Sequence, residues 1–165
     1  MTKDEIKVLN TVIHLFPTEL GEPEDKMEFR IRAGSVFPLD VLGRLANMVS
    51  DVQIFSDRMV VFVNRGDPEC VKLGKASQDR RVDKQVAQYT KKSDVEGDKR
   101  AYAIARCLMI HLNCDGSFVE TARGIRANIH EFVLLSELTN VKTGLEVYNP
   151  DVAVHVEKGA LYVMI

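Results

Sequence analysis

The chain has no tryptophan among its 165 residues, and phenylalanine and tyrosine bring the aromatic fraction to only 7%. A carbohydrate platform or a base-stacking surface is built largely from aromatic rings, so little material for either is present. The three cysteines, Cys70, Cys107 and Cys114, form an odd and sparse set. A chain of this length does not need disulfide staples, and we therefore predict free thiols in a reducing, cytoplasmic environment.

Strong charge and long apolar runs are also absent. The formal net charge is only −2, which argues against a protein that coats nucleic acid or an anionic membrane with its whole surface. No stretch approaches the roughly 18 apolar residues of a membrane helix, and the opening MTKDEIKVLN has no basic segment followed by an apolar one. We expect no contact with a membrane. The composition, 45% hydrophobic and 28% charged, is that of an ordinary globular protein.

Motifs that hold phosphates, dinucleotides or metals are missing as well. The sequence contains no GxxxxGK[ST], GxGxxG, HExxH or DxDxDG pattern. From this we predict no catalytic residue, no cofactor and no metal ligand, so that the protein is not expected to be an enzyme.

What is present is an internal similarity. Residues 41 to 66 align without a gap on residues 134 to 159, with six identical pairs out of 26. Short similarities upstream, such as VIHL at 12 to 15 and MIHL at 109 to 112, extend the match. The pattern predicts a tandem duplication of a helix-strand-helix-strand-strand unit. We expect one compact, two-layer α+β protein with pseudo-two-fold symmetry and a mainly antiparallel sheet. The ranges are 1–66 for repeat A, 67–97 for a linker and 98–165 for repeat B.

In repeat A, Thr2 and Glu5 have the spacing of a capping box, and Ile6, Leu9, Ile13 and Phe16 recur at helical spacing until Pro17. Alternation then predicts a strand at 27–32, and Pro38 opens a predicted helix that ends near Ser50. A hairpin is expected over 52–63. Repeat B is predicted to contain a helix at 98–113, a strand at 117–124, a helix near 128–142, a hairpin at 145–156 and a last strand at 160–165.

The linker is the one electrostatically distinct region. Residues 72 to 100 hold nine basic and five acidic side chains, a net charge of +4. It is interpreted as a solvated connector or, alternatively, as a binding element for nucleic acid. For the second case the candidate binding residues are Lys72, Lys75, Arg80, Arg81, Lys84, Lys91 and Lys92, supported by Arg123 and Arg126.

The last strand is strongly apolar for a chain end. A terminal segment of this kind has to be tied into a sheet or an interface. We predict that it forms an interface, as an edge strand that pairs with another protein or a second copy. The candidate interface residues are Leu161, Tyr162, Val163, Met164 and Ile165.

Three weaker patterns remain as alternatives. Cys107, His111 and Cys114 share a helical spacing that could serve zinc, although structural packing is the simpler interpretation. His111, Cys114 and Asp115 could form a nucleophile site, although the NCDGS segment is typical of a turn. Residues 117 to 144 can be read as a helix-turn-helix, against which the repeat alignment predicts a strand at 117–124.

Taken together, these features predict a non-enzymatic adaptor or regulatory protein that binds another protein and can form a homodimer. The alternative is a nucleic-acid-binding protein that uses the basic 72–100 segment.

Overall fold

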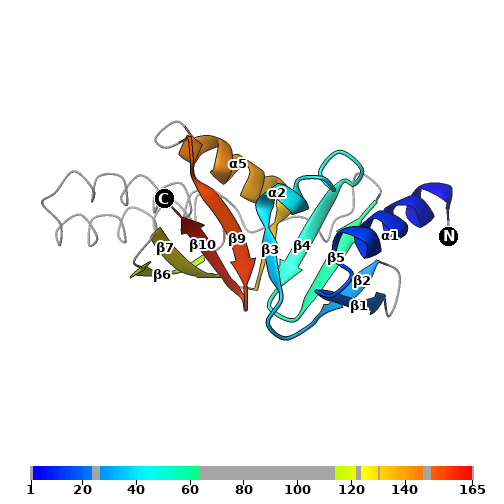
Figure 1. Ribbon diagram of the computed structural model, residues 1–165, viewed down its shortest axis with the longest axis horizontal. Coiled ribbons are helices and arrows are strands. Elements are labelled where there is room, and N and C mark those ends of the chain that lie inside the picture. The colour runs from blue at the N-terminus through cyan, green and yellow to red at the C-terminus, as the bar shows by residue number, and fades with distance from the viewer. Residues whose placement is uncertain are drawn as a thin grey trace, which may run out of the picture.

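The computed structural model describes residues 2–23, 27–63, 114–121, 124–129, 131–146 and 150–164, with only the backbone path for 114–121. Helices and antiparallel strands alternate along these ranges, so the protein belongs to the α+β class (Figure 1). The helices are α1 (Lys3–Leu15), α2 (Leu39–Leu42) and α5 (Leu135–Glu146). The strands are β1 (Leu20–Pro23), β2 (Glu28–Ile31), β3 (Val36–Pro38), β4 (Asp51–Phe55), β5 (Arg58–Phe62), β6 (Cys114–Thr121), β7 (Gly124–Ile129), β8 (Phe132–Leu134), β9 (Ala153–Glu157) and β10 (Ala160–Met164).

The strands in the described ranges form two five-stranded sheets. Sheet A has the order β1-β2-β5-β4-β8, and sheet B has the order β3-β9-β10-β7-β6. Each sheet therefore takes its short strand, β8 or β3, from the other half of the chain. The two orders coincide when β1, β2, β5, β4 and β8 are matched with β6, β7, β10, β9 and β3. This topological match is a property of the fold, and the tandem duplication itself stays a prediction.

The gapless register of the sequence alignment is wrong. It pairs Val41 of α2 with Leu134 of β8, and from residue 145 onward it pairs the end of α5 with β4. Leu145 and Glu146 end α5, and the second hairpin is β9–β10, with Lys158 and Gly159 as its turn. Their φ values of 50° and 70° are those of a two-residue turn with both central residues left-handed, which suits the twist of a hairpin. The segment between the start of the helix and the hairpin is six residues longer in the second half, so the hairpins correspond in space but not in the alignment.

The predicted cap of helix α1 is confirmed, but its predicted buried face is not. The Glu5 amide donates to Thr2 Oγ1 at 3.2 Å, and the Thr2 amide donates to Glu5 Oε2 at 3.1 Å. Val8, Val12 and Phe16 are buried, whereas Ile6 and Ile13, which were expected to face the core, are exposed. The apolar side of this helix is wider than the surface that covers it.

The predicted helix from Pro38 to Ser50 is shorter than expected. Its regular part ends at Leu42, and the amides of Arg44, Leu45 and Met48 then bond to carbonyls three residues back. Such tighter turns have poorer hydrogen-bond geometry than an α-helix but still keep Leu45 fully buried.

One continuous core lies between the helices and one face of both sheets. Cross-strand partners share a face, so a buried row runs across each sheet. The rows are Phe29, Met59, Ile54 and Val133 in sheet A, and Ala127, Leu161, Val156 and Phe37 in sheet B. Helices α2 and α5 lie together across the middle of the molecule, and Lys142 of α5 forms an ion pair with Asp40 of α2 (Figure 1).

The terminal strand is not at an edge. β10 lies inside sheet B and pairs with β9 on one side and β7 on the other. Its backbone groups are therefore used within the chain, and the predicted edge-strand interface through 160–165 is wrong. The apolar sequence is explained by the core, because Leu161 and Val163 are completely buried.

Several short strands were not predicted. β1 lies between the predicted first helix and the predicted strand at 27–32, and β3 and β8 are three-residue strands whose pairing is entirely non-local. β6 and β7 form an antiparallel pair over residues that the helix-turn-helix alternative requires to be helical, which excludes that alternative. None of the helices in the described part of the chain has the length and apolarity needed to span a bilayer. The predicted helix at 98–113 and the linker at 67–97 lie outside the described residues.

Candidate protein-binding surface

The face of sheet A that points away from the core carries a row of large side chains. Arg30 on β2 is the cross-strand partner of Arg58 on β5, and Phe55 on β4 is the partner of Phe132 on β8. Arg58 also lies over the ring of Phe55, with its guanidinium carbon 3.9 Å from the ring centroid. We call Arg30, Arg58, Phe55 and Phe132 the outer row. It is assembled from four strands and from both halves of the chain.

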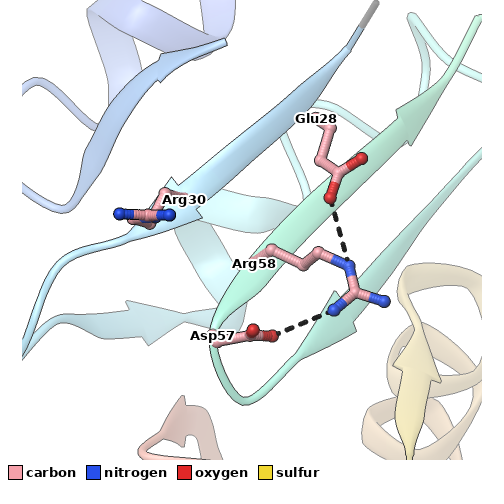
Figure 2. Close-up of a pocket in the computed structure, with 4 residues that line it drawn as sticks. All are labelled: Glu28, Arg30, Asp57 and Arg58. Atoms are coloured by element: carbon pink, nitrogen blue, oxygen red, sulfur yellow. Dashed lines mark hydrogen bonds and ion pairs between the residues drawn. The ribbon is translucent and has the colours of Figure 1, made fainter. Parts of the chain in front are cut away.

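Arg58 is held in place from two sides. Its Nε donates to Glu28 Oε1 at 3.3 Å, and an Nη1 atom donates to Asp57 Oδ1 at 3.2 Å. Figure 2 shows Arg58 between these two carboxylates, with Arg30 set apart on the neighbouring strand. Two arginines directly opposite each other repel, and the carboxylates of Glu28 and Asp57 offset that repulsion. The Arg58 side chain keeps 40% of its surface exposed, so it is ordered and still accessible.

The two aromatic rings form the other end of the outer row. Phe55 and Phe132 lie with their centroids 5.2 Å apart at an interplanar angle of 47°. Both are half-buried. A tilted aromatic pair with a guanidinium stacked on one ring is a rigid arrangement, because the contacts restrict the rotamers of all three side chains.

A shallow depression of about 140 Å³ lies beside this row, lined by Glu28, Arg30, Asp57 and Arg58. Its lining holds two positive and two negative side chains. An anion would have to compete with Glu28 and Asp57 for Arg58, so the depression is poorly suited to a free phosphate. Aromatic side chains and arginine are instead enriched at protein–protein interfaces, whose rims are polar.

Only part of this face is accessible. Gln53, Phe62 and Leu134 lie on the same face of sheet A by strand register, and all three are buried. The exposed part is consequently limited to the end of the sheet near the β4–β5 turn. This confines a partner to the outer row and its two carboxylates.

The turn beside the outer row is fixed by the rest of the fold. The Ile31 amide donates to the Asp57 carbonyl at 2.8 Å, and the equivalent Ile129 amide donates to the Gly159 carbonyl at 2.9 Å. The two hairpin turns also meet, since a Cβ placed on Gly159 would lie 3.0 Å from Ser56 Cβ. The surface is therefore built on a braced turn rather than on a free loop.

The outer face of sheet B carries different side chains from the outer face of sheet A. His155 and Tyr162 stack with their centroids 4.8 Å apart at 6°, and His155 Nε2 lies 3.7 Å from Glu157 Oε2. Arg126, the cross-strand partner of Tyr162, donates from Nη2 to Asn128 Oδ1 at 3.4 Å. No hydrogen bond is formed by its buried Nε within the described part of the chain.

The residues predicted from sequence are dispersed. Arg126 lies on β7 in sheet B, and the linker that it was expected to support lies outside the described residues. The seven linker residues, Arg123, Ile165, Cys107 and His111 lie outside the described residues. The backbone of Cys114 and Asp115, the other members of the alternative sets, lies on β6 and not in a turn. Tyr162 and Met164 are half-buried on the outer face of sheet B, and Leu161 and Val163 are in the core. Among the residues that the structure describes, no three histidine, cysteine, aspartate or glutamate side chains gather as a metal site.

The outer row was missed by the sequence interpretation. The alternation through β4 and β5 could have placed Phe55 and Arg58 on one face, because the hairpin was predicted correctly. Nothing in the sequence pairs Phe55 with Phe132, which lies on a three-residue strand of the other half.

Comparison with known proteins gives no assignment. The chain matches no protein-family model, and no curated protein or solved structure is significantly similar to it.

Proposed function

We propose that this protein is a cytoplasmic adaptor or regulatory protein that binds another protein through the outer row. The observation that carries the proposal is the stack of Arg58, Phe55 and Phe132 on an accessible, braced face of sheet A. Arginine and aromatic side chains dominate the energetics of protein interfaces, and rigid ones lose little entropy on binding.

The local charge supports a protein partner over nucleic acid at this surface. Both exposed carboxylates beside Arg58 would repel a phosphate backbone. A protein partner can meet them with its own basic and polar groups while an apolar side chain covers the rings of Phe55 and Phe132.

The proposal is tested by capture of partners on the full-length chain and on two variants. Each variant replaces one aromatic side chain by alanine. Phe132→Ala removes one ring of the outer row, and Tyr162→Ala removes one ring of the stacked pair on sheet B. Partners are identified by cross-linking and mass spectrometry, and binding of each is then measured by titration. Circular dichroism and a thermal melt check that both variants fold.

The expected result is a partner whose affinity falls at least about tenfold with Phe132→Ala, as for an interface hot spot, and remains unchanged with Tyr162→Ala. Cross-links should fall near the β4–β5 turn. A partner that binds both variants as tightly as the unmodified chain would contradict the proposal.

Self-association is a second candidate, and a different observation favours it. Within the described residues the outermost strands are β1 and β8 in sheet A and β3 and β6 in sheet B. β1 is short, carries Glu22 and Pro23, and has a register shift, all of which protect an edge. β6 also has a register shift, between Cys114 and Phe118, but it is eight residues long and pairs regularly with β7 from Phe118 to Thr121. Its length makes it the edge best able to pair with a second copy.

Two proline variants test this pairing. Successive residues of a strand direct their amides to opposite edges, so one of Val119→Pro and Glu120→Pro removes an outward amide and the other an amide facing β7. Light scattering should show a dimer for the unmodified chain. The variant that removes the outward amide should keep its thermal midpoint and become a monomer. A monomer at all concentrations would contradict self-association, while leaving binding through the outer row untouched.

A further inference from the structure

Helix α1 exposes two large apolar side chains beside its buried face. Ile6 is 46% exposed and Ile13 is 48% exposed, although each lies within about 60° of half-buried Leu9 on the helix surface. Val8, Val12 and Phe16 on the other side of Leu9 are buried in the core. These apolar side chains thus share one side of α1, interrupted only by Glu5 in the first turn, and the protein covers only half of them. We call Ile6, Leu9 and Ile13 the α1 stripe.

The side chains beyond the stripe are basic or neutral. Lys3, Lys7, Asn10 and His14 are exposed and continue around the helix from the stripe. The two acidic residues of the helix lie off this border. Asp4 falls on the far side of Lys7, and Glu5 falls on the opposite flank, about 40° from Leu9, where its carboxylate accepts from the Thr2 amide at the cap. The stripe is therefore bordered along one side by positive charge, without a carboxylate between Lys3 and His14 on that arc.

The position of α1 leaves this side open. The helix lies at one end of the molecule, and its N-terminal end points away from the sheets (Figure 1). Its buried residues belong to the core shared by both sheets, where Phe16 packs against Phe37 with ring centroids 5.3 Å apart, and not to the outer face of sheet A that carries the outer row. A partner on the α1 stripe would accordingly occupy a different surface from the one proposed above.

We propose that the α1 stripe is the docking site for an acidic amphipathic helix of a partner protein. Ile6 and Ile13 are two helical turns apart, roughly 10 Å, which matches apolar side chains at positions i, i+3 or i+4, and i+7 of an incoming helix. Carboxylates on the flank of that helix would meet Lys3 and Lys7. Charge complementarity selects the partner, because a basic helix would meet the same lysines with repulsion.

The experiment uses the full chain and a defined probe. The probe is a fluorescent 14-residue peptide with leucine at i, i+3, i+7 and i+10 and mostly glutamate and alanine elsewhere. Two matched peptides serve as controls: one with every glutamate replaced by lysine, and one with the same composition in scrambled order. Binding is followed by fluorescence anisotropy at low and at physiological ionic strength.

The protein variants separate the apolar from the charged contribution. Ile6→Gln together with Ile13→Gln removes the stripe, and Lys3→Gln together with Lys7→Gln removes its basic border. All four side chains are exposed, so the thermal midpoint is expected to stay unchanged. Phe132→Ala serves as the control on the other surface.

We expect saturable binding of the acidic peptide, weakened at least tenfold by the isoleucine variant, several-fold by the lysine variant, and unaffected by Phe132→Ala. Higher salt should weaken it too. Equal binding of the scrambled or the lysine peptide would overturn the proposal, as would absence of binding or binding that survives the isoleucine variant. Vesicles containing phosphatidylserine provide a further check, and isoleucine-dependent association with them in the absence of peptide binding would overturn the proposal in favour of a membrane surface.

Discussion

Replacement of Leu161 by alanine discriminates sharply between an interface strand and a core strand. Leu161 is completely buried as the second residue of β10, where its cross-strand neighbours on the same face are Val156 of β9 and Ala127 of β7. Both flanking strands are hydrogen-bonded to β10, so they cannot move inward to fill the space left by the side chain. The methyl group of Ala127 is too short to fill that space.

The expected cost follows from that packing. Leucine-to-alanine changes in cores destabilise by about 2–5 kcal/mol, and sites that cannot collapse lie in the upper part of that range. We expect about 3–4 kcal/mol for Leu161→Ala. For a chain of this size each kcal/mol lowers the thermal midpoint by about 2–4 °C, which gives a decrease of roughly 6–16 °C.

The assay is thermal unfolding followed by circular dichroism, with urea unfolding as an independent measure of the free energy. Met164→Ala is the matched control, since Met164 ends the same strand but is half-buried on its other face. Its cost should be about 1 kcal/mol. If Leu161→Ala melts within about 2 °C of Met164→Ala, or changes the mass by light scattering without changing the melt, the core assignment of β10 is refuted.

Three further predictions use the same measurements. Asp51→Ala should lower the free energy of unfolding by about 1–2 kcal/mol, because Asp51 Oδ1 accepts from the Ser136 amide at 3.1 Å and Oδ2 accepts from Ser136 Oγ at 2.6 Å at the first turn of α5; a melt equal to that of the unmodified chain would contradict this role. Gly159→Ala should cost about 1–2 kcal/mol because its φ is 70°, whereas Lys158→Asn should be neutral or stabilising at φ 50°, and the reverse order would contradict the turn assignment. Retention on heparin that falls steeply with salt is expected if the basic 72–100 segment binds phosphate, and absence of retention at low salt would discard the nucleic-acid alternative.

The predictable part of the fold is the part set by neighbouring residues. Thr2 and Glu5 are three positions apart, so their reciprocal cap could be read directly and is confirmed. The β4–β5 hairpin is likewise confirmed, because alternation and a short polar turn act within a dozen residues. Helix α5 was expected from the alignment with the first half of the chain, although it spans Leu135–Glu146 rather than about 128–142.

The errors share one physical cause, which is that several local patterns are compatible with more than one tertiary partner. Ile6 and Ile13 have the spacing of a buried stripe, yet the core accepts Val8 and Val12 from the adjoining arc. The apolar composition of Ala160 to Met164 fits an aggregation-prone edge strand and an interior strand equally well. Only the pairing of this strand with both β9 and β7 decides between the two positions.

The amino-acid sequence by itself determined the α+β class, the cap of α1 and the first hairpin, because capping, alternation and turn chemistry depend on residues a few positions apart. The tertiary structure decided the exchange of β3 and β8 between the sheets, the burial of β10 and the assembly of the outer row. Those features depend on contacts such as Phe55 with Phe132, 77 positions apart. Their pairing is selected by the closure of the whole core, which no local pattern encodes.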